Sequence, residues 1–145
     1  MSERVQSYKN HTRFLPAWHF FVLPVLLANV LNTVRYLWRA PSEGTVFAVI
    51  VSVALLTMGL LARTQALTVQ DRVIRLEMRL RLRQLLGPDL QAGINQLSAG
   101  QLTALRFASD EELPVLVQEV LAGRIQTGKD IKLQVKKWQA DFLRA

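Results

Sequence analysis

Several residue types that carry chemistry are scarce in this chain of 145 residues. It contains no cysteine, which excludes disulfides, thiolate metal sites and cysteine nucleophiles. Its two histidines, His11 and His19, lie near the amino end with no carboxylate or second ligand at metal-binding spacing. No other catalytic set of side chains is present. We therefore expect a protein that is not an enzyme and that holds no metal or cofactor.

Charged residues are absent from two long apolar stretches. Residues 14–34 and 45–62 contain no Asp, Glu, Lys or Arg. A helix crosses a bilayer with about 20 apolar residues, and buried strands are much shorter. Trp18 and Trp38 lie roughly 30 Å apart along a helix, which suits the two membrane interfaces. The stretches predict two transmembrane helices, at residues 14–38 and 45–62, joined by a short external loop at residues 39–44.

Basic residues gather just outside the two predicted spans. Residues 63–83 hold six arginines against two acidic residues, and residues 1–13 hold three basic residues against one glutamate. Residues 84–145, in contrast, hold seven basic and seven acidic residues. Positively charged flanks of transmembrane helices stay on the cytoplasmic side. We therefore predict a cytoplasmic amino-terminal segment, residues 1–13, and a carboxyl terminus on the same side.

Polar side chains interrupt the first apolar stretch. Asn29, Asn32 and Thr33 share one helical face with Tyr36. Such groups either form hydrogen bonds between helices or mark a pathway through the membrane. None of them is ionised at neutral pH, which favours helix–helix contact. The alternative is that Asn29, Asn32 and Thr33 serve a small oligomeric transporter or channel component.

Two more features of the apolar stretches concern packing. Ala48, Ser52 and Gly59 form a stripe of small residues that would let another helix approach closely. Pro24 cannot donate the amide bond to the carbonyl of Phe20, so we expect a kink there.

An arginine-rich segment, RVIRLEMRLRLR, occupies residues 72–83. Its second half alternates like a strand, but Val73 and Ile74 break the alternation. No Gly or Pro occurs between residues 60 and 86, and Gly87-Pro88 is the first strong stop. The segment therefore belongs to a basic helical extension of the second span, residues 63–86.

The helical extension carries two apolar stripes beside its arginines. The first comprises Val69, Val73, Leu76 and Leu80, and the second comprises Ile74, Met78, Leu82 and Leu85. Two such stripes are too much apolar surface for an isolated helix, so one should be covered by the distal domain and the other by a second copy or a partner. The first stripe has coiled-coil spacing, but over only about two heptads.

Three kinds of partner could engage the arginines of the extension. Each basic residue near an anionic bilayer contributes about 1 kcal/mol of binding. Nucleic acid is disfavoured because the distal domain has no net charge and no recognisable reading motif. We therefore predict contact with anionic lipid headgroups or with a protein partner or homo-oligomer. The candidate contact residues are Arg63, Arg72, Arg75, Arg79 and Arg83.

Residues 87–145 predict a small cytoplasmic domain of three or four short helices. Ser98 with Gln101, and Ser109 with Glu112, resemble capping boxes, and the acidic residues 110–112 would lie in a first helical turn. Gly123 would end that helix.

A last helix near residues 129–143 would place Ile131, Val135, Trp138 and Phe142 on one face. GRIQTGKD, residues 123–130, matches part of a phosphate-binding loop but lacks the Ser or Thr after its lysine and a preceding strand, so we do not expect nucleotide binding.

Four stretches of the chain resemble a family of small, uncharacterised bacterial membrane proteins classed as a domain of unknown function. They are YKNHTRFLPAWHF, ALTVQDRVIRLEMRLR, LRFASDEELPVLV and DIKLQVKKWQADFLRA, and they cover somewhat under half of the chain. The resemblance implies a bacterial plasma membrane protein with two spans, and it implies no activity. The sequence thus predicts an all-α protein, a two-helix transmembrane hairpin whose second helix extends into a small cytoplasmic helical bundle. Its expected role is that of a non-catalytic membrane-anchored adaptor or accessory subunit.

Overall fold

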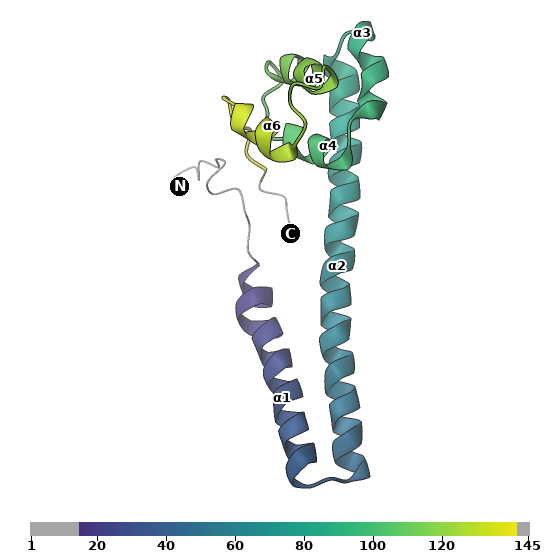
Figure 1. Ribbon diagram of the computed structural model, residues 1–145, viewed down its shortest axis with the longest axis vertical. Helices are drawn as coiled ribbons and strands as arrows, with labels where there is room; N and C mark the ends of the chain where they lie inside the picture. The colour runs from purple at the N-terminus through teal and green to yellow at the C-terminus, as the bar shows by residue number, and fades with distance from the viewer. Residues whose placement is uncertain (1–14, 142–145) are drawn as a thin grey trace. The chain divides into compact units, whose positions relative to one another are not determined.

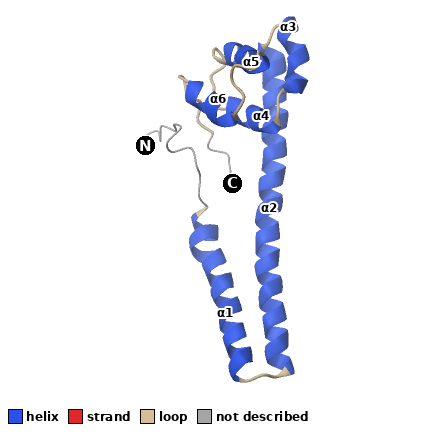
Figure 2. Cartoon of the chain, in the orientation of Figure 1, coloured by secondary structure: helices blue, strands red, loops and turns tan. Residues whose placement is uncertain are grey.

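The computed structural model describes residues 15–141 (Figure 1). Every regular element among these residues is helical, so the all-α prediction is confirmed (Figure 2). The elements are the π-helix η1 (Ala17–Val22), α1 (Leu23–Arg39), α2 (Glu43–Leu85), α3 (Pro88–Gln91), the 3-10 helix η2 (Ala92–Gln96), α4 (Ala99–Leu105), α5 (Leu113–Leu121) and α6 (Gly128–Gln134). The described residues form two compact units that meet within α2, between Thr68 and Val69.

The first unit, up to Thr68, is an antiparallel pair made of η1 with α1 and the first part of α2. The hydroxyls of Thr33 and Ser52 lie 2.9 Å apart. Further along, a Cβ added at Gly59 would lie 3.2 Å from both Leu26 and Trp18, so α1 approaches α2 closely at this glycine. Both helices, Ala17–Arg39 and Glu43–Leu85, are long and apolar enough to cross a membrane.

The first apolar helix is irregular at the position where Pro24 predicts a disturbance. Residues Ala17–Val22 form a π-helix, and the amide of Leu23 donates to the carbonyl of Trp18, five residues earlier. Pro24 follows in the first turn of α1, directly after this π-helix. The proline is therefore accommodated by a change of helix type directly before it.

α2 is one continuous helix of 43 residues. It ends where the sequence predicts, because Gly87 adopts an extended conformation and Pro88 opens α3. The uninterrupted extension predicted after the second apolar stretch is therefore confirmed.

The second unit, from Val69 onward, packs α3 to α6 on one face of α2. The core combines residues of α2, and Leu86 directly after it, with residues of α4, α5 and α6: Met78, Leu82, Leu86, Leu102, Leu105, Leu113, Val117 and Ile131. Ile74, Met78 and Leu82 are between 0% and 6% exposed. The second predicted stripe of α2 is thus the buried one: Met78 and Leu82 lie in the core with the distal helices, and Leu85 packs against that core.

Two of the predicted helix boundaries are confirmed in detail. Ser98 caps α4 through a capping box, in which its hydroxyl accepts from the amide of Gln101 and its own amide donates to the Gln101 side chain. Gly123 ends α5 with a φ of 75°, the left-handed conformation that glycine adopts readily. The amide of Arg124 then bonds the carbonyl of Glu119 at 3.0 Å, which completes a Schellman motif.

The predicted helix at residues 129–143 is wrong beyond Gln134, where α6 ends. Val135 is extended, and the amide of Gln139 donates to the carbonyl of Phe107 at 2.7 Å. The Trp138 ring stacks on Phe107 with centroids 4.5 Å apart. This tertiary pairing satisfies the backbone and buries the tryptophan face, which outweighs the weak helical preference of a short segment. Phe142 lies outside the described residues.

Candidate functional site

The part of α2 that belongs to the second unit carries an exposed apolar stripe. Val69, Val73, Leu76 and Leu80 are between 47% and 60% exposed. They lie opposite Ile74, Met78 and Leu82, which are buried, the last two in the core shared with the distal helices. As the sequence predicts, one apolar stripe of the helix is covered within the chain and the other is not. An exposed apolar patch of this kind is typical of an interaction surface.

Three of the predicted contact arginines border this stripe. Arg72, Arg79 and Arg83 are exposed, and helical geometry places them on one flank of the stripe. Arg75 is half-buried and its Nε donates to the carbonyl of Asp71 at 3.0 Å. Arg63 is half-buried within the first unit. Contact of these five arginines with lipid or with a partner stays a prediction.

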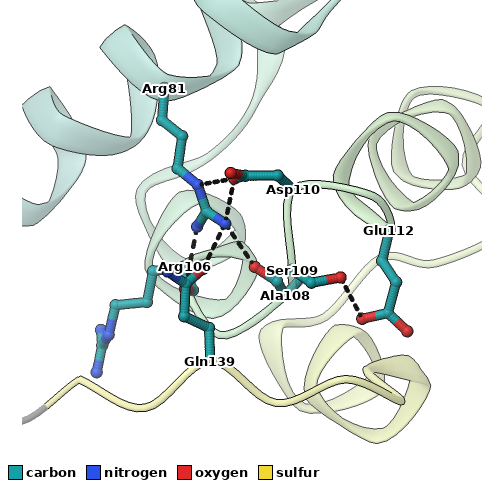
Figure 3. A network of polar contacts seen from close by, with 7 residues as sticks. All are labelled: Arg81, Arg106, Ala108, Ser109, Asp110, Glu112 and Gln139. Atoms are coloured by element: carbon teal, nitrogen blue, oxygen red, sulfur yellow. Dashed lines mark hydrogen bonds and ion pairs between the residues drawn. The ribbon is translucent and has the colours of Figure 1, made fainter.

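A sixth arginine, Arg81, is the hub of a polar network that the sequence analysis missed (Figure 3). Its Nε donates to Oδ1 of Asp110 at 2.7 Å, and Nη2 donates to the carbonyl of Ala108 at 2.8 Å and to Gln139 at 2.5 Å. Nη1 reaches the carbonyl of Arg106 at 3.3 Å. This one side chain therefore ties α2 to the α4–α5 connection and to the segment after α6. The sequence does contain a signal for this role of Arg81. On a helical projection Arg81 falls outside the stripe of the other arginines and beside Ile74, on the side that faces the apolar stripe of Met78 and Leu82.

The acidic run at residues 110–112 differs from its predicted role. α5 begins at Leu113 and has no acidic residue in its first turn, and Glu112 occupies the N-cap position without a capping hydrogen bond. The predicted capping box at Ser109 is therefore wrong, although its hydroxyl contacts the Glu112 carboxylate at 3.4 Å.

Each of the three acidic side chains bonds another segment instead. Asp110 pairs with Arg81, Glu111 with the Lys137 ammonium, and Glu112 accepts the amides of Lys136 and Lys137 at 3.1 Å. The carboxylates of Glu111 and Glu112 hold the segment that follows α6, which explains why a continuous helix does not form there.

Two exposed ion pairs shift carboxyl pKa values in this unit. The hydrogen bond and charge of Lys137 lower the pKa of Glu111, and the hydrogen bond of Arg124 lowers the pKa of Glu119. Glu119 and Arg124 are joined by two contacts of 2.5 and 2.6 Å. Both glutamates are therefore ionised at neutral pH and serve structure.

Arg106 closes the carboxyl-terminal segment over the core. Its side chain, 7% exposed, forms a 3.1 Å ion pair with Asp141 and lies 4.2 Å above the Phe107 ring. The Phe107 ring therefore makes a cation–π contact with Arg106 and a stacking contact with Trp138. Trp138 acts as a packing residue, as the sequence predicts.

The loop that resembles a phosphate-binding motif is built as a helix cap. Thr127 accepts the amide of Asp130 at 3.2 Å and starts α6, and Arg124 is engaged by Glu119. Within residues 15–141, no group of three His, Asp or Glu side chains is arranged to hold a metal ion.

The polar residues of the first span, predicted to form hydrogen bonds between helices from one shared face, do not all do so. The Thr33 hydroxyl lies 2.9 Å from the Ser52 hydroxyl, and Ser52 is 1% exposed. Asn29 and Asn32 are exposed, and Asn32 accepts a 3.4 Å bond from Arg35 of its own helix. Of the three predicted residues, only Thr33 bonds across to α2. Of the predicted small-residue stripe, Ser52 and Gly59 face α1, whereas Ala48 is exposed.

These features define an all-α protein with two long apolar helices and a small helical unit packed on the end of the second. The family of unknown function DUF6526 matches residues 1–145, the whole chain. The chain belongs to this family. No curated protein and no solved structure matches it significantly.

Proposed function

We propose that the chain is a non-catalytic membrane-anchored adaptor or accessory subunit. In this role η1 with α1 and the first part of α2 cross the bacterial plasma membrane, and the helical unit is presented in the cytoplasm for protein assembly. The observation that carries the proposal is the exposure of large apolar side chains along both helices, such as Phe20 at 75% in the first and Phe47 at 66% in the second. Water would make this exposure costly, whereas lipid would cover it.

The distribution of charge supports the orientation in the membrane. Arginines follow the second apolar stretch, and the connection between α1 and α2 is short. Anionic headgroups would attract Arg63 and the basic residues near it. Both termini then lie in the cytoplasm.

The construction of the helical unit supports a role in assembly. Its hydrogen bonds and ion pairs are used to hold its own segments together, as the Arg81 network and the Glu112 contacts show. Meanwhile the apolar stripe of α2 is left uncovered. This arrangement favours a binding surface over a catalytic one.

The size of the particle in mild detergent tests the adaptor role. A full chain of 16.4 kDa that acts in assembly should elute as a complex larger than one chain plus its detergent. Elution as a lone monomer at all concentrations would contradict the proposal.

Transport is the second candidate function, and the exposure of Asn29 and Asn32 on the outside of the hairpin is what favours it. Amide side chains facing lipid are costly unless another helix or a water-filled path meets them. If several hairpins assembled, these residues could line such a path.

A further inference from the structure

The uncovered apolar stripe of α2 has the spacing of a coiled-coil seam. Val69, Val73, Leu76 and Leu80 follow one another at intervals of four, three and four residues. This spacing assigns Val73 and Leu80 to a positions of a heptad and Val69 and Leu76 to d positions. At the centre of the seam, β-branched Val73 at a is followed by Leu76 at d, a combination that favours two strands over three or four, whereas Val69 at d and Leu80 at a do not have this preference.

The residues that flank the seam are complementary in charge to those of a second copy. Arg72 and Arg79 occupy g positions, and Glu77 occupies an e position. In a parallel pair, a g residue faces the e residue five positions later on the other helix. Arg72 of one copy therefore meets Glu77 of the other, and two-fold symmetry makes this pair twice.

The same charges oppose an antiparallel pair. In that arrangement g residues face g residues, which would bring Arg72 of one copy beside Arg79 of the other. Like charges at these positions destabilise the pairing. The pattern thus selects one relative direction of the two helices.

We propose that a second copy of this chain covers the stripe, through a parallel two-stranded coiled coil of α2 centred on Val73 and Leu76. The proposal rests on the proposed function in one respect: two copies anchored in one membrane with the same orientation present α2 in the parallel direction. It names the partner that the assembly role leaves open.

Two features compensate for the shortness of the seam. The helix is already formed and held by core residues such as Met78 and Leu82, so that pairing does not have to order it. These core residues lie on the opposite side of α2 from the seam, so the distal helices do not obstruct a second copy. Anchoring in one membrane raises the effective concentration of the two copies as well.

A lipid surface is the rival occupant of this face, because arginines border an apolar stripe. Glu77 distinguishes the two, since it lies on the exposed flank of the seam, where anionic headgroups would repel it. In the coiled coil the same residue receives Arg72 of the other copy.

Cysteine cross-linking tests the seam directly, because the chain has no native cysteine. The full chain carrying Leu76→Cys, at a d position, should form a disulfide-linked dimer in membranes under mild oxidation. Asp71→Cys, exposed and on the far side of the helix from the seam, is the matched control and should stay monomeric. Equal cross-linking at both positions, or none at Leu76→Cys, would overturn the proposal.

A charge exchange then separates the second copy from lipid. In the Leu76→Cys chain, Glu77→Arg should lower dimer formation about fivefold, because Arg72 then meets an arginine. Adding Arg72→Glu should restore it. Lipid binding predicts the reverse order, in which Glu77→Arg strengthens attachment; unchanged cross-linking in Glu77→Arg would also overturn the proposal.

The outcome can be distinguished from failure of membrane anchoring. Cross-linking of Leu76→Cys is repeated in detergent micelles, where the seam is intact without a bilayer. Release of the chain from membranes by alkaline carbonate would refute the anchor alone. Loss of cross-linking with the chain retained in the membrane would refute the coiled coil alone.

Discussion

The Nε atom of Arg81 lies 2.7 Å from Oδ1 of Asp110, and the two residues are 29 positions apart in the chain. This contact joins α2 to the turn that precedes α5. The same guanidinium also holds the carbonyl of Ala108 and the side chain of Gln139. It is therefore the residue of α2 whose polar contacts most directly fix the helical unit.

Arg81→Ala should loosen the helical unit. It removes four hydrogen bonds, of which those to the partly buried carbonyls matter most, and should cost about 2 kcal/mol. Amide hydrogen exchange across residues 99–141 should accelerate about 30-fold. Arg79→Ala is the control, because Arg79 is exposed on the other side of the helix, and its exchange should match the unchanged protein. Equal effects of the two substitutions would contradict a special role for Arg81.

Acid should weaken the helical unit through Glu111 and Glu119. Lys137 and Arg124 lower the pKa values of these carboxyls below their ordinary value of 4.5. A lowered folded-state pKa contributes stability that is present above 4.5 and is lost as the pH falls through the lowered values. Exchange protection should thus stay level from pH 7 to 5 and fall below about 4.5. Glu111→Gln with Glu119→Gln should reduce this loss of exchange protection at low pH. An unaltered loss would contradict its assignment to Glu111 and Glu119.

The pairing of α1 with α2 predicts a specific disulfide. The hydroxyl oxygens of Thr33 and Ser52 lie 2.9 Å apart, so Thr33→Cys with Ser52→Cys should oxidise within one chain. Electrophoretic mobility before and after reduction measures the bond. Asn32→Cys with Ser52→Cys is the control, because Asn32 is exposed away from the contact. Preferential bonding of the control pair would show that α1 is rotated.

Gly59→Leu should disrupt this pairing. A Cβ there would already lie 3.2 Å from Leu26 and Trp18, so a larger side chain must push the helices apart. The rate of the Thr33→Cys and Ser52→Cys disulfide should fall by about tenfold, whereas Gly44→Leu should leave it unchanged, because a Cβ at Gly44 would meet only Ser42, at an ordinary contact distance of 3.8 Å. A rate unaffected by Gly59→Leu would contradict close packing at this glycine.

Substitution of the exposed amides distinguishes the two proposed functions. Asn29→Leu with Asn32→Leu should leave anchoring and the Thr33–Ser52 contact intact, because both asparagines are exposed and Ser52 bonds the hydroxyl of Thr33. Leakage of potassium from vesicles loaded with the ion measures transport. If the chain is an adaptor, vesicles that contain the unsubstituted chain or the double variant should leak no more potassium than vesicles without protein. Leakage that the unsubstituted chain supports and the double variant loses, with assembly intact, would favour transport.

The sequence predicts the long elements well because their signals are continuous. The apolar stretches and the absence of Gly or Pro between residues 60 and 86 fix two long helices, and Gly87-Pro88 fixes the end of the second. The spacing of the two stripes on α2 predicts that the distal helices cover one of them, but only the structure shows that it is the stripe of Met78 and Leu82. Local signals also predict two helix boundaries correctly. The side chain of Ser98 defines the start of α4, and the positive φ angle of Gly123 defines the end of α5.

The errors occur where distant contacts decide the local structure. Residues 135–141 have a helical pattern, yet they are not helical, because they bond to Phe107, Glu112 and Arg106 instead. The acidic residues 110–112 resemble a cap in sequence, but their partners lie 24 to 29 positions away. The periodicity of a single helix likewise groups Asn29 and Asn32 with Thr33, whereas the neighbouring helix selects only Thr33.

Accessibility of single cysteines tests most directly the claim that two apolar helices anchor a cytoplasmic helical unit. Ser42→Cys lies in the connection between α1 and α2, and Asp89→Cys lies exposed in α3. A thiol reagent that cannot cross membranes should label Ser42→Cys in intact cells and Asp89→Cys only after the membrane is opened. Labelling of Asp89→Cys in intact cells, or protection of Ser42→Cys until the membrane is opened, would contradict the account.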